Sequence, residues 1–324
     1  MKYIIAFDGG GTKTHIGLFD ELGHLLYQNT GLGCNHSSSD GHQFKIVIEK
    51  LFLDALQTVK LNKTDIDFIF LGLSGADIES DFIKLNQAGS EIFGNIPFKI
   101  VNDAWIIMRS GLKSAFGAVA ISGTGTNSAA IGINGEKAIL RSLGFTLGIY
   151  GGGLDIAREG LHYAFRSEEL TYKSTILETE IPPLLGCNNM NDVVSLFYPT
   201  TKISKQDFGK ITALVFECAV KGDQVSKEIL LKIGKCIGEQ TGGVIKQVHI
   251  ENLEVPVVVG GRVFDGISPI LMNEFIKNLH LTCPKAYIIK PIYKPVVGAY
   301  LSALDELQII QDEQIEKNLN ESWK

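Results

Sequence analysis

The chain has 324 residues, 45% of them hydrophobic, so its length and composition suggest two domains of ordinary size, each with a core. Its formal net charge is −6 and it contains no basic block, which argues against nucleic acid or an anionic membrane as a partner. No apolar run approaches the roughly 18 residues that a membrane span requires.

Cysteine and histidine usage argues against a disulfide framework and a zinc site. The five cysteines are odd in number and scattered, and no C-x-x-C occurs, which fits reduced thiols in a cytoplasm. The seven histidines show neither H-E-x-x-H nor another paired metal spacing. The N-terminal apolar run is too short for a signal peptide. We therefore expect a cytoplasmic protein.

Residues 3–19 are predicted to form a β-hairpin with a glycine-rich turn. An apolar run, Tyr3–Phe7, leads to Asp8, then three glycines and Thr-Lys-Thr follow before alternation resumes at Ile16. Glycines let the backbone approach a ligand closely, so that several N–H groups can point at a polyphosphate. Asp8, beside the turn, is placed to hold a hydrated Mg²⁺.

Two competing phosphate motifs do not fit this segment. Phe7 stands where a P-loop would have its first glycine, and a Rossmann turn would open a helix rather than a strand. The remaining alternative is a tight glycine turn that Asp8 merely caps.

The rest of the N-terminal half alternates predicted strands and helices. We expect strands over 24–30, 66–73 and 98–101, and helices over 41–59 and 82–93. The last strand ends in Asn102-Asp103-Ala104, and a carboxylate at a strand's carboxyl end is where α/β sheets carry out chemistry. The alternative is that Asp103 is the N-cap of the following helix. Asn35 lies in a predicted loop, where an asparagine most often caps a turn.

A second copy of the hairpin motif begins 114 residues later. Ala120–Asn134 repeats the apolar strand, the Gly/Thr turn and the alternating strand, with Thr126 matching Thr12 and Ser128 matching Thr14. A repeat at this spacing indicates two related lobes rather than a solenoid. Two such hairpins facing each other would grip a polyphosphate from both sides.

The C-terminal half is predicted to be mostly helical. Helices are expected over 154–165, through most of 168–250, over 268–279 and over 296–316, and strands over 255–259 and 287–290. The first of these strands ends in Gly260-Gly261-Arg262, which leaves room for a ligand against the backbone but is more often a plain turn. The last thirteen residues are expected to fray.

The segments D-G-G-G-T-K-T at Asp8–Thr14 and I-S-G-T-G-T-N-S at Ile121–Ser128 resemble the two phosphate motifs of the actin/hsp70/sugar-kinase superfamily. Within it, the chain is most similar to the N-acetylglucosamine kinase-like branch, which includes the ATPases that activate dehydratases and benzoyl-CoA reductase. The resemblance implies a two-lobed actin-like, ribonuclease H-like α/β fold. The expected lobes are residues 1–112, with the C-terminal helix 300–324 packing back on them, and residues 113–299.

The resemblance also implies roles for particular residues. Asp103 would be the general base, and Asp8 would hold Mg²⁺ through water. ATP would be bound by Gly10, Gly11, Thr12, Lys13, Thr14, Gly123, Thr124, Gly125, Thr126, Asn127, Gly260, Gly261 and Arg262. A sugar would be bound by Asn35, His36, Ser74, Gly75, Asn102 and Phe145. A homodimer is also expected from the resemblance.

The function expected from these motifs is an ATP-dependent sugar kinase acting on N-acetylglucosamine or a related amino sugar. The alternatives are a dehydratase-activating ATPase, which would need cysteines at a subunit interface, and a non-catalytic nucleotide- or sugar-binding protein. One departure bears on the sugar. The branch carries an acidic pair where this chain has Ile149-Tyr150, and Asp155 is the nearest carboxylate that could compensate. The sequence does not choose the sugar.

Overall fold

The computed structural model describes residues 1–36 and 42–322, which belong to two compact units. The first unit combines Met1–Ser114 with Ile289–Lys324, and the second is Ala115–Ile288. The sequence analysis had assigned residues 289–299 to the second lobe, whereas in the structure this segment groups with the first unit.

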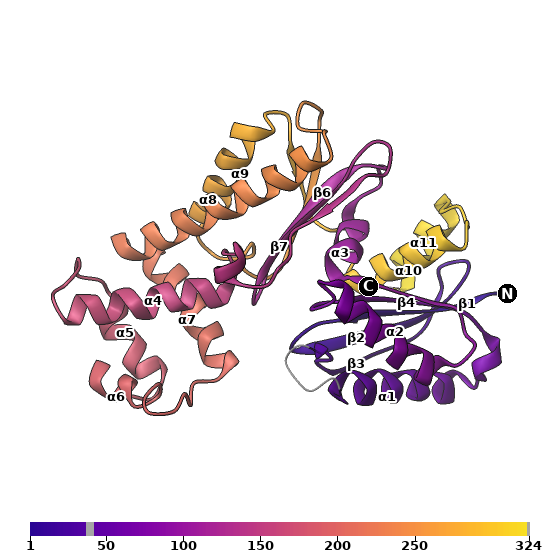
Figure 1. The fold of residues 1–324 in the computed structure, drawn as a ribbon, viewed down its shortest axis with the longest axis horizontal. Helices are drawn as coiled ribbons and strands as arrows, with labels where there is room; N and C mark the ends of the chain where they lie inside the picture. Colours follow the sequence, from indigo (N-terminus) through magenta and orange to yellow (C-terminus); the bar gives the residue numbers. More distant parts are fainter. Residues whose placement is uncertain (37–41, 323–324) are drawn as a thin grey trace. The chain divides into compact units, whose positions relative to one another are not determined.

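The first unit is an α/β unit built on one five-stranded sheet (Figure 1). Its elements are β1 (Tyr3–Gly9), β2 (Lys13–Asp20), β3 (Leu25–Leu32), α1 (His42–Val59), the 3-10 turn η2 (Lys63–Asp65), β4 (Ile66–Leu73), α2 (Glu79–Phe93), β5 (Phe98–Asn102), α3 (Asp103–Gly111), α10 (Pro295–Glu306) and α11 (Glu313–Ser322). Residue 41, predicted to begin α1, lies outside the described residues.

Alternation along β1 explains why helices cover both faces of this sheet. Ile5 and Phe7 pack with buried residues of α1 and α2, whereas Ile4 and Ala6 pack with α10. The strand order is β3-β2-β1-β4-β5, with β1, β4 and β5 parallel to one another. The carboxyl ends of these three strands therefore meet at one edge.

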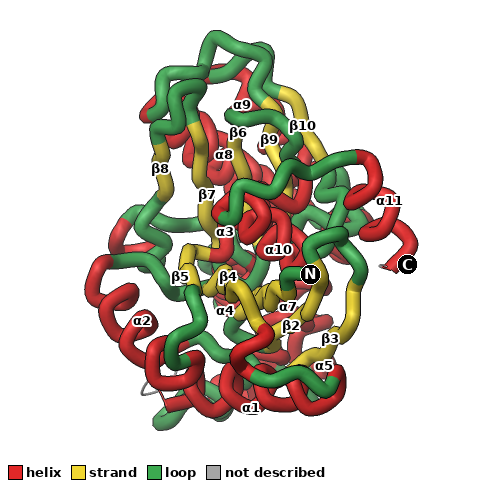
Figure 2. Tube along the Cα trace, turned by 90° about the vertical axis from the view of Figure 1, so that its right-hand side faces the viewer, coloured by secondary structure: helices red, strands yellow, loops and turns green. Residues whose placement is uncertain are grey.

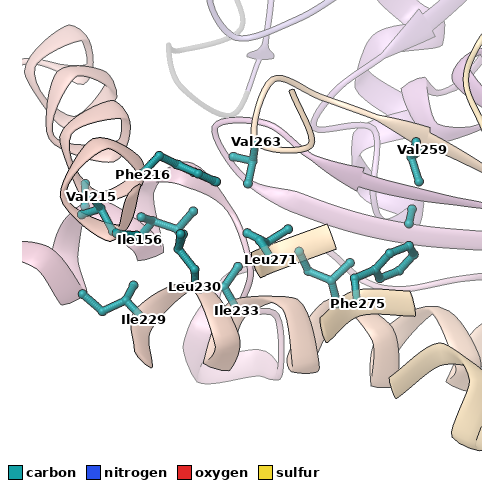
Figure 3. Packing of buried hydrophobic residues seen from close by; sticks show 14 of the residues in the cluster. Ile156, Val215, Phe216, Ile229, Leu230, Ile233, Val259, Val263, Leu271 and Phe275 are labelled. Carbon is teal, nitrogen blue, oxygen red and sulfur yellow. The ribbon is translucent and has the colours of Figure 1, made fainter. Parts of the chain in front are cut away.

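The second unit combines a five-stranded sheet with a helical layer. Its elements are β6 (Gly117–Ser122), β7 (Thr126–Ile131), β8 (Lys137–Ile139), the 3-10 turn η3 (Phe145–Leu147), α4 (Gly153–Glu168), α5 (Leu177–Leu184), α6 (Met190–Val194), α7 (Lys205–Val220), α8 (Gln224–Gln247), β9 (Pro256–Gly260), α9 (Ile270–Thr282) and β10 (Tyr287–Ile289). Its core joins α4, α7, α8 and α9 to β9, and Figure 3 shows Leu230, Ile233, Leu271 and Phe275 among the side chains of this core.

The two sheets repeat one topology, as the sequence repeat predicted. The second sheet has the order β8-β7-β6-β9-β10, in which β6 pairs antiparallel with β7 and parallel with β9, as β1 pairs with β2 and β4. The fold class inferred from the sequence is therefore confirmed.

The two hairpins differ in register, and the one-to-one matching of their second strands is wrong. In the first, Gly10 pairs with Lys13 and the tip is Gly11-Thr12. In the second, the Gly123 N–H bonds to the Gly125 carbonyl oxygen at 2.9 Å, so the tip is Thr124 alone. A shorter turn shifts every residue that follows it along the ladder, so Thr126 does not occupy the place of Thr12.

The C-terminal segment also differs from the prediction of one long helix followed by a frayed end. Gln308 has φ of +56° and α10 ends before it, while Asp312 caps a separate helix by accepting the Ile315 N–H at 2.9 Å. In that helix, α11, Ile315 and Leu319 are buried against the first unit. Residues 323–324 lie outside the described part.

The close packing of α10 on α3 depends on Gly298. A Cβ at this position would lie 2.0 Å from the Ile106 carbonyl oxygen, so the two helices would have to separate. Gly298→Ala should lower stability by about 1–3 kcal/mol, the usual cost of overpacking. Thermal denaturation tests this, with Gly209→Ala in α7 as the matched control, because a Cβ there meets no other atom within 4 Å. That control should be neutral or slightly stabilising. Equal melting temperatures for the Gly298 variant and the parent would contradict the packing.

Candidate active site

Most of the predicted catalytic and sugar-binding residues lie at the carboxyl edge of the first sheet. Asp8 lies near the end of β1, Ser74 and Gly75 follow β4, and Asp103 follows β5. Figure 2 shows β4 and β5 as neighbouring strands of this sheet, and α3 begins directly after β5. Parallel pairing thus collects polar groups from three distant stretches of sequence at one edge.

Backbone hydrogen bonds hold the first glycine turn to its neighbours at this edge. The Ser74 N–H donates to the Gly9 carbonyl at 2.8 Å, and the Cys34 N–H donates to the Gly10 carbonyl at 3.1 Å. At Gly11, by contrast, a Cβ would meet no atom within 4 Å, and φ there is not positive. Neither packing nor backbone conformation within this unit therefore requires glycine at position 11.

The threonine and lysine side chains of this turn fall into two groups. Thr12 and Lys13 are exposed at the tip. Thr14 is fully buried and its hydroxyl donates to the Leu32 carbonyl at 2.7 Å. Thr14 was predicted to bind ATP, but its hydroxyl proton is already used in this bond, so the hydroxyl is not a free donor for a phosphate.

Asn35 lies against the loop that follows β4. Its Nδ2 donates to the Ser74 hydroxyl at 3.2 Å. Gly75 has φ of +86°, and a Cβ there would lie 2.6 Å from the Asn35 Oδ1, so both conformation and space require glycine. His36 Nε2 lies 3.1 Å from Asp81 Oδ1, at the start of α2. The structure thus brings Asn35, Ser74 and Gly75 together, with His36 next to Asn35 in the chain and against Asp81.

Asp103 is not the N-cap of α3, which was the alternative to a catalytic role. The N-cap is Asn102, whose Oδ1 accepts the Ala104 N–H at 2.9 Å. Asp103 is the first residue of the helix, and its carboxylate accepts hydrogen bonds from the backbone of Ala104 and from its own N–H. Capping therefore does not explain an aspartate at this position.

Three carboxylates at this edge titrate well above their ordinary range. Burial raises the pKa of Asp8 to about 6, although the Lys13 charge opposes this. Burial and the neighbouring Asp81 raise the pKa of Asp77 to about 6. Burial raises the pKa of Asp103 to about 7, and the charges of Asp8 and Asp77 add to the effect. A carboxylate with a pKa near 7 has the basicity that a general base needs at neutral pH.

The sequence analysis missed Asp77, whose Oδ1 accepts a hydrogen bond from Asn102 Nδ2 at 2.8 Å. The signal in the sequence is a carboxylate shortly after a predicted strand, and in the structure that strand, β4, pairs with β5, which ends at Asn102. Single-sequence reasoning assigned no role to the third residue after Ser74, since strand adjacency is not visible along the chain.

The second glycine turn is held by α4 and by the loop after β9. The N–H groups of Gly153 and Leu154 donate to the carbonyls of Gly123 and Thr124 at 2.8 and 3.1 Å. Gly261 has φ of +93°, and a Cβ there would lie 2.3 Å from the Ser122 carbonyl. Gly260-Gly261 thus lies beside the second hairpin, and the adjacent Arg262 is exposed.

Other predicted residues of the second unit have structural roles. Thr126 is buried and its hydroxyl donates to the Ile121 carbonyl at 2.7 Å, so the hydroxyl cannot also donate to a phosphate. Asn127 is buried and its Oδ1 accepts the Ser128 N–H. At Gly125, by contrast, a Cβ meets no atom within 4 Å. Phe145 is 71% exposed and its ring contacts Tyr150 edge-on.

The residues that replace the acidic pair lie inside the second unit. Ile149 is buried, and the Tyr150 ring packs beneath the Lys232 ammonium, 5.1 Å away. Asp155 does not replace the pair, because its Oδ2 accepts the N–H groups of Gly151 and Gly152 at the start of α4. A carboxylate introduced at position 149 would be buried, so restoring the first member of the pair would destabilise the fold rather than create a sugar ligand.

The donors at the first sheet edge suit a hydrated Mg²⁺. Within residues 1–36 and 42–322, no three histidine, cysteine or acidic side chains form a metal cage. Mg²⁺ usually takes only one or two carboxylates and completes its shell with water and phosphate oxygens. Asp8 has a partly buried carboxylate whose pKa burial raises to about 6 despite the charge of Lys13, so a cation bound there would stabilise its ionised form. The residues present therefore fit this ion.

No helix of the described chain is long and apolar enough to cross a membrane.

Two α/β units with one repeated strand order and a glycine hairpin in each define the actin-like ATPase fold. The chain belongs to the BadF/BadG/BcrA/BcrD ATPase family, whose sequence model matches residues 7–303.

Two curated relatives are similar over nearly their full lengths. The N-acetylmuramic acid/N-acetylglucosamine kinase of Clostridium acetobutylicum is 29% identical over 313 residues, which cover 94% of this chain and 99% of the relative. The N-acetyl-D-glucosamine kinase of Dictyostelium discoideum is 30% identical over 319 residues, covering 94% of this chain and 98% of the relative.

Solved structures share the fold at lower identity. A provisionally assigned N-acetylglucosamine kinase from Chromobacterium violaceum aligns with a TM-score of 0.69 at 16% identity, over 93% of this chain and 98% of that chain. A glucokinase of the ROK family from Streptomyces griseus, solved with glucose and AMPPNP, aligns with a TM-score of 0.56 at 16% identity, over 92% and 98%.

The raised pKa of Asp103 predicts a cost in stability that depends on pH. Between pH 3.8 and about 7 the folded state holds a proton that the unfolded state releases, so stability falls as pH rises through this window. Asp103→Asn removes the titrating group. We expect the variant to melt a few degrees above the parent at pH 8, and by a smaller margin at pH 5. A margin that is equal at both pH values would contradict the raised pKa.

Proposed function

We propose that this protein is an ATP-dependent kinase that phosphorylates an amino sugar, N-acetylglucosamine or N-acetylmuramic acid. The two relatives are named for these substrates, and each matches this chain over nearly its whole length.

The observation that carries the proposal is Asp103. It is a partly buried carboxylate at the carboxyl end of β5, it is released from capping by Asn102, and its pKa is raised to about 7. Phosphoryl transfer to a sugar requires a group that accepts the hydroxyl proton and orients the oxygen for attack. Asp103 would accept that proton as the bond between the sugar oxygen and phosphorus forms and the bond to ADP breaks.

The sugar would bind beside Asp103, to side chains of the loop that follows β3 and of the loop that follows β4. Asn35, Ser74 and His36 supply an amide, a hydroxyl and an imidazole, which suit the alternating donors and acceptors of sugar hydroxyls. The hydrogen bond from Asn35 to Ser74, and the approach of His36 Nε2 to Asp81 Oδ1 at 3.1 Å, hold these side chains in place before a ligand arrives. Such preorganisation lowers the entropy cost of orienting the acceptor hydroxyl.

Each glycine hairpin would bind ATP phosphates through its backbone. Gly11 and Gly125 are exposed glycines that neither packing nor backbone conformation within their own units requires, and they lie at the first tip and next to Thr124 at the second tip, respectively. A phosphate that approaches the backbone N–H groups closely would explain why these positions are glycine, because a side chain there would block the approach. Thr12 and Lys13 would add a hydroxyl and a positive charge at the first tip. The loop Gly260–Arg262 would border the nucleoside.

Asp8 would hold Mg²⁺, with water completing the shell. The ion, when bound with ATP, supplies positive charge to the phosphoryl oxygens. Asp8 lies 3.6 Å from His15 Nδ1, and Lys13 is the positive charge that acts on both side chains. The protein's own contribution is to fix this carboxylate by strand pairing, Asp8 being opposite His15 in β2 and Gly72 in β4.

Purified protein should transfer the γ-phosphoryl group of ATP to N-acetylglucosamine or N-acetylmuramic acid within a panel of hexoses and amino sugars. Asp103→Asn should lower turnover by about 10²–10⁴, the usual worth of a positioned acid–base group, because the amide cannot accept the proton. Product formation by mass spectrometry and nucleotide binding by calorimetry check both parts.

Calorimetry also provides the control, because Asp103→Asn should bind ATP as the parent does. Nucleotide binding without phosphorylation of any sugar in the panel would favour a binding protein instead. Near-normal turnover in the variant would remove Asp103 from the mechanism.

A further inference from the structure

One asparagine connects two loops at the active-site edge of the first sheet. Asn102 Oδ1 accepts the Ala104 N–H at 2.9 Å and so caps α3. Its Nδ2 donates to Asp77 Oδ1 at 2.8 Å and to the Ala76 carbonyl at 3.3 Å. The amide is thereby held at both ends, and its orientation depends on what Asp77 offers it.

Asp77 is itself held by the start of α2. Asp81 Oδ2 accepts the N–H groups of Asp77 and Ile78 at 3.2 and 3.0 Å, and Asp81 Oδ1 lies 3.1 Å from His36. Asp77 is also partly buried, which makes its hydrogen bond with Asn102 stronger than an exposed one. The β4–α2 loop is therefore a fixed support rather than a free connection.

We propose that Asp77 is a positioning residue for phosphoryl transfer: through Asn102 it sets the first turn of α3 and so the direction of the Asp103 carboxylate. The inference rests on the proposed function for its catalytic consequence. Its structural part, the dependence of the α3 cap on Asp77, stands independently of the substrate.

A hydrogen bond from an amide to a carboxylate explains the residue type. Asn102 Nδ2 can only donate, so its partner must be an acceptor. An acceptor at position 77 fixes which end of the amide faces Ala104, because the Oδ1 is then turned towards the helix. Without that acceptor Nδ2 keeps only its longer bond to the Ala76 carbonyl, so the cap is held less firmly and the helix start, including Asp103, gains freedom. A displacement of about 1 Å at a catalytic group costs up to about 10²-fold in rate.

Two substitutions of Asp77 test whether its ability to accept the Asn102 hydrogen bond is what matters. Asp77→Ala removes the acceptor, whereas Asp77→Asn keeps an Oδ1 that can accept from Asn102. We expect kcat to fall about 10–100-fold in Asp77→Ala with the KM for ATP within about twofold of the parent, and to recover most of this loss in Asp77→Asn. Glu79→Gln, an exposed neighbour in the first turn of α2, is the matched control and should resemble the parent.

Amide hydrogen exchange at Ala104 tests the structural part without any assay of activity. Exchange should quicken in Asp77→Ala and stay near the parent rate in Asp77→Asn. If no sugar is phosphorylated, this result still supports the positioning role while the proposed function fails. Parent-like exchange at Ala104 in Asp77→Ala would overturn the positioning role, as would an Asp77→Asn variant that is no better than Asp77→Ala in turnover.

A double-mutant cycle covers the case in which Asp77→Ala does not fold. Asn102→Ser keeps an N-cap oxygen but is too short to bridge to Asp77. Combined with Asp77→Ser, whose hydroxyl is likewise too short to bridge, it should lose no more kcat than Asn102→Ser alone, because the link is already broken. Fully independent losses at the two positions would contradict a path from Asp77 through Asn102.

Discussion

The partial burial of three carboxylates at one sheet edge is the constraint on which the active site of the first unit depends. Parallel pairing of β1, β4 and β5 places Asp8, Asp77 and Asp103 at the same edge, where burial raises the pKa of each and the charges of Asp8 and Asp77 raise the pKa of Asp103 further. This arrangement costs stability in the free protein at neutral pH. Burial also makes Asp103 more basic and lets a cation stabilise the ionised form of Asp8. The stability cost and the proposed chemistry therefore have one origin.

The glycines of the second unit show how a repeated motif is adapted. Gly261 is required because the β9 loop crosses the hairpin within van der Waals distance, whereas Gly125 is not required by anything within its unit. Gly261 thus allows the β9 loop to pack on the hairpin, whereas Gly125 leaves the backbone of the turn accessible to a ligand. The buried threonines Thr14 and Thr126 support their hairpins through hydroxyl bonds to nearby carbonyls, so backbone groups rather than these hydroxyls are left to meet a phosphate.

The sequence predicted the features that are local or periodic. Both hairpins, the strand ending at Asn102, the long helix α8 and the repeated architecture follow from apolar patterns and glycine turns. The separate helix α11 was missed because its break depends on a positive φ at Gln308. The hairpin register was misjudged because turn length depends on backbone pairing. Asp77 was missed because its relation to Asn102 crosses 25 residues and becomes visible only when β4 and β5 pair.

The most direct test of this account is the titration of the Asp103 carboxyl carbon, followed by nuclear magnetic resonance in protein labelled at aspartate and assigned with Asp103→Asn. The account predicts a midpoint near pH 7, well above the ordinary 3.8 for aspartate, because the group is buried beside Asp8 and Asp77. A midpoint near 4 would show that Asp103 is solvated and free of its neighbours, and would contradict the electrostatic basis of the proposed active site.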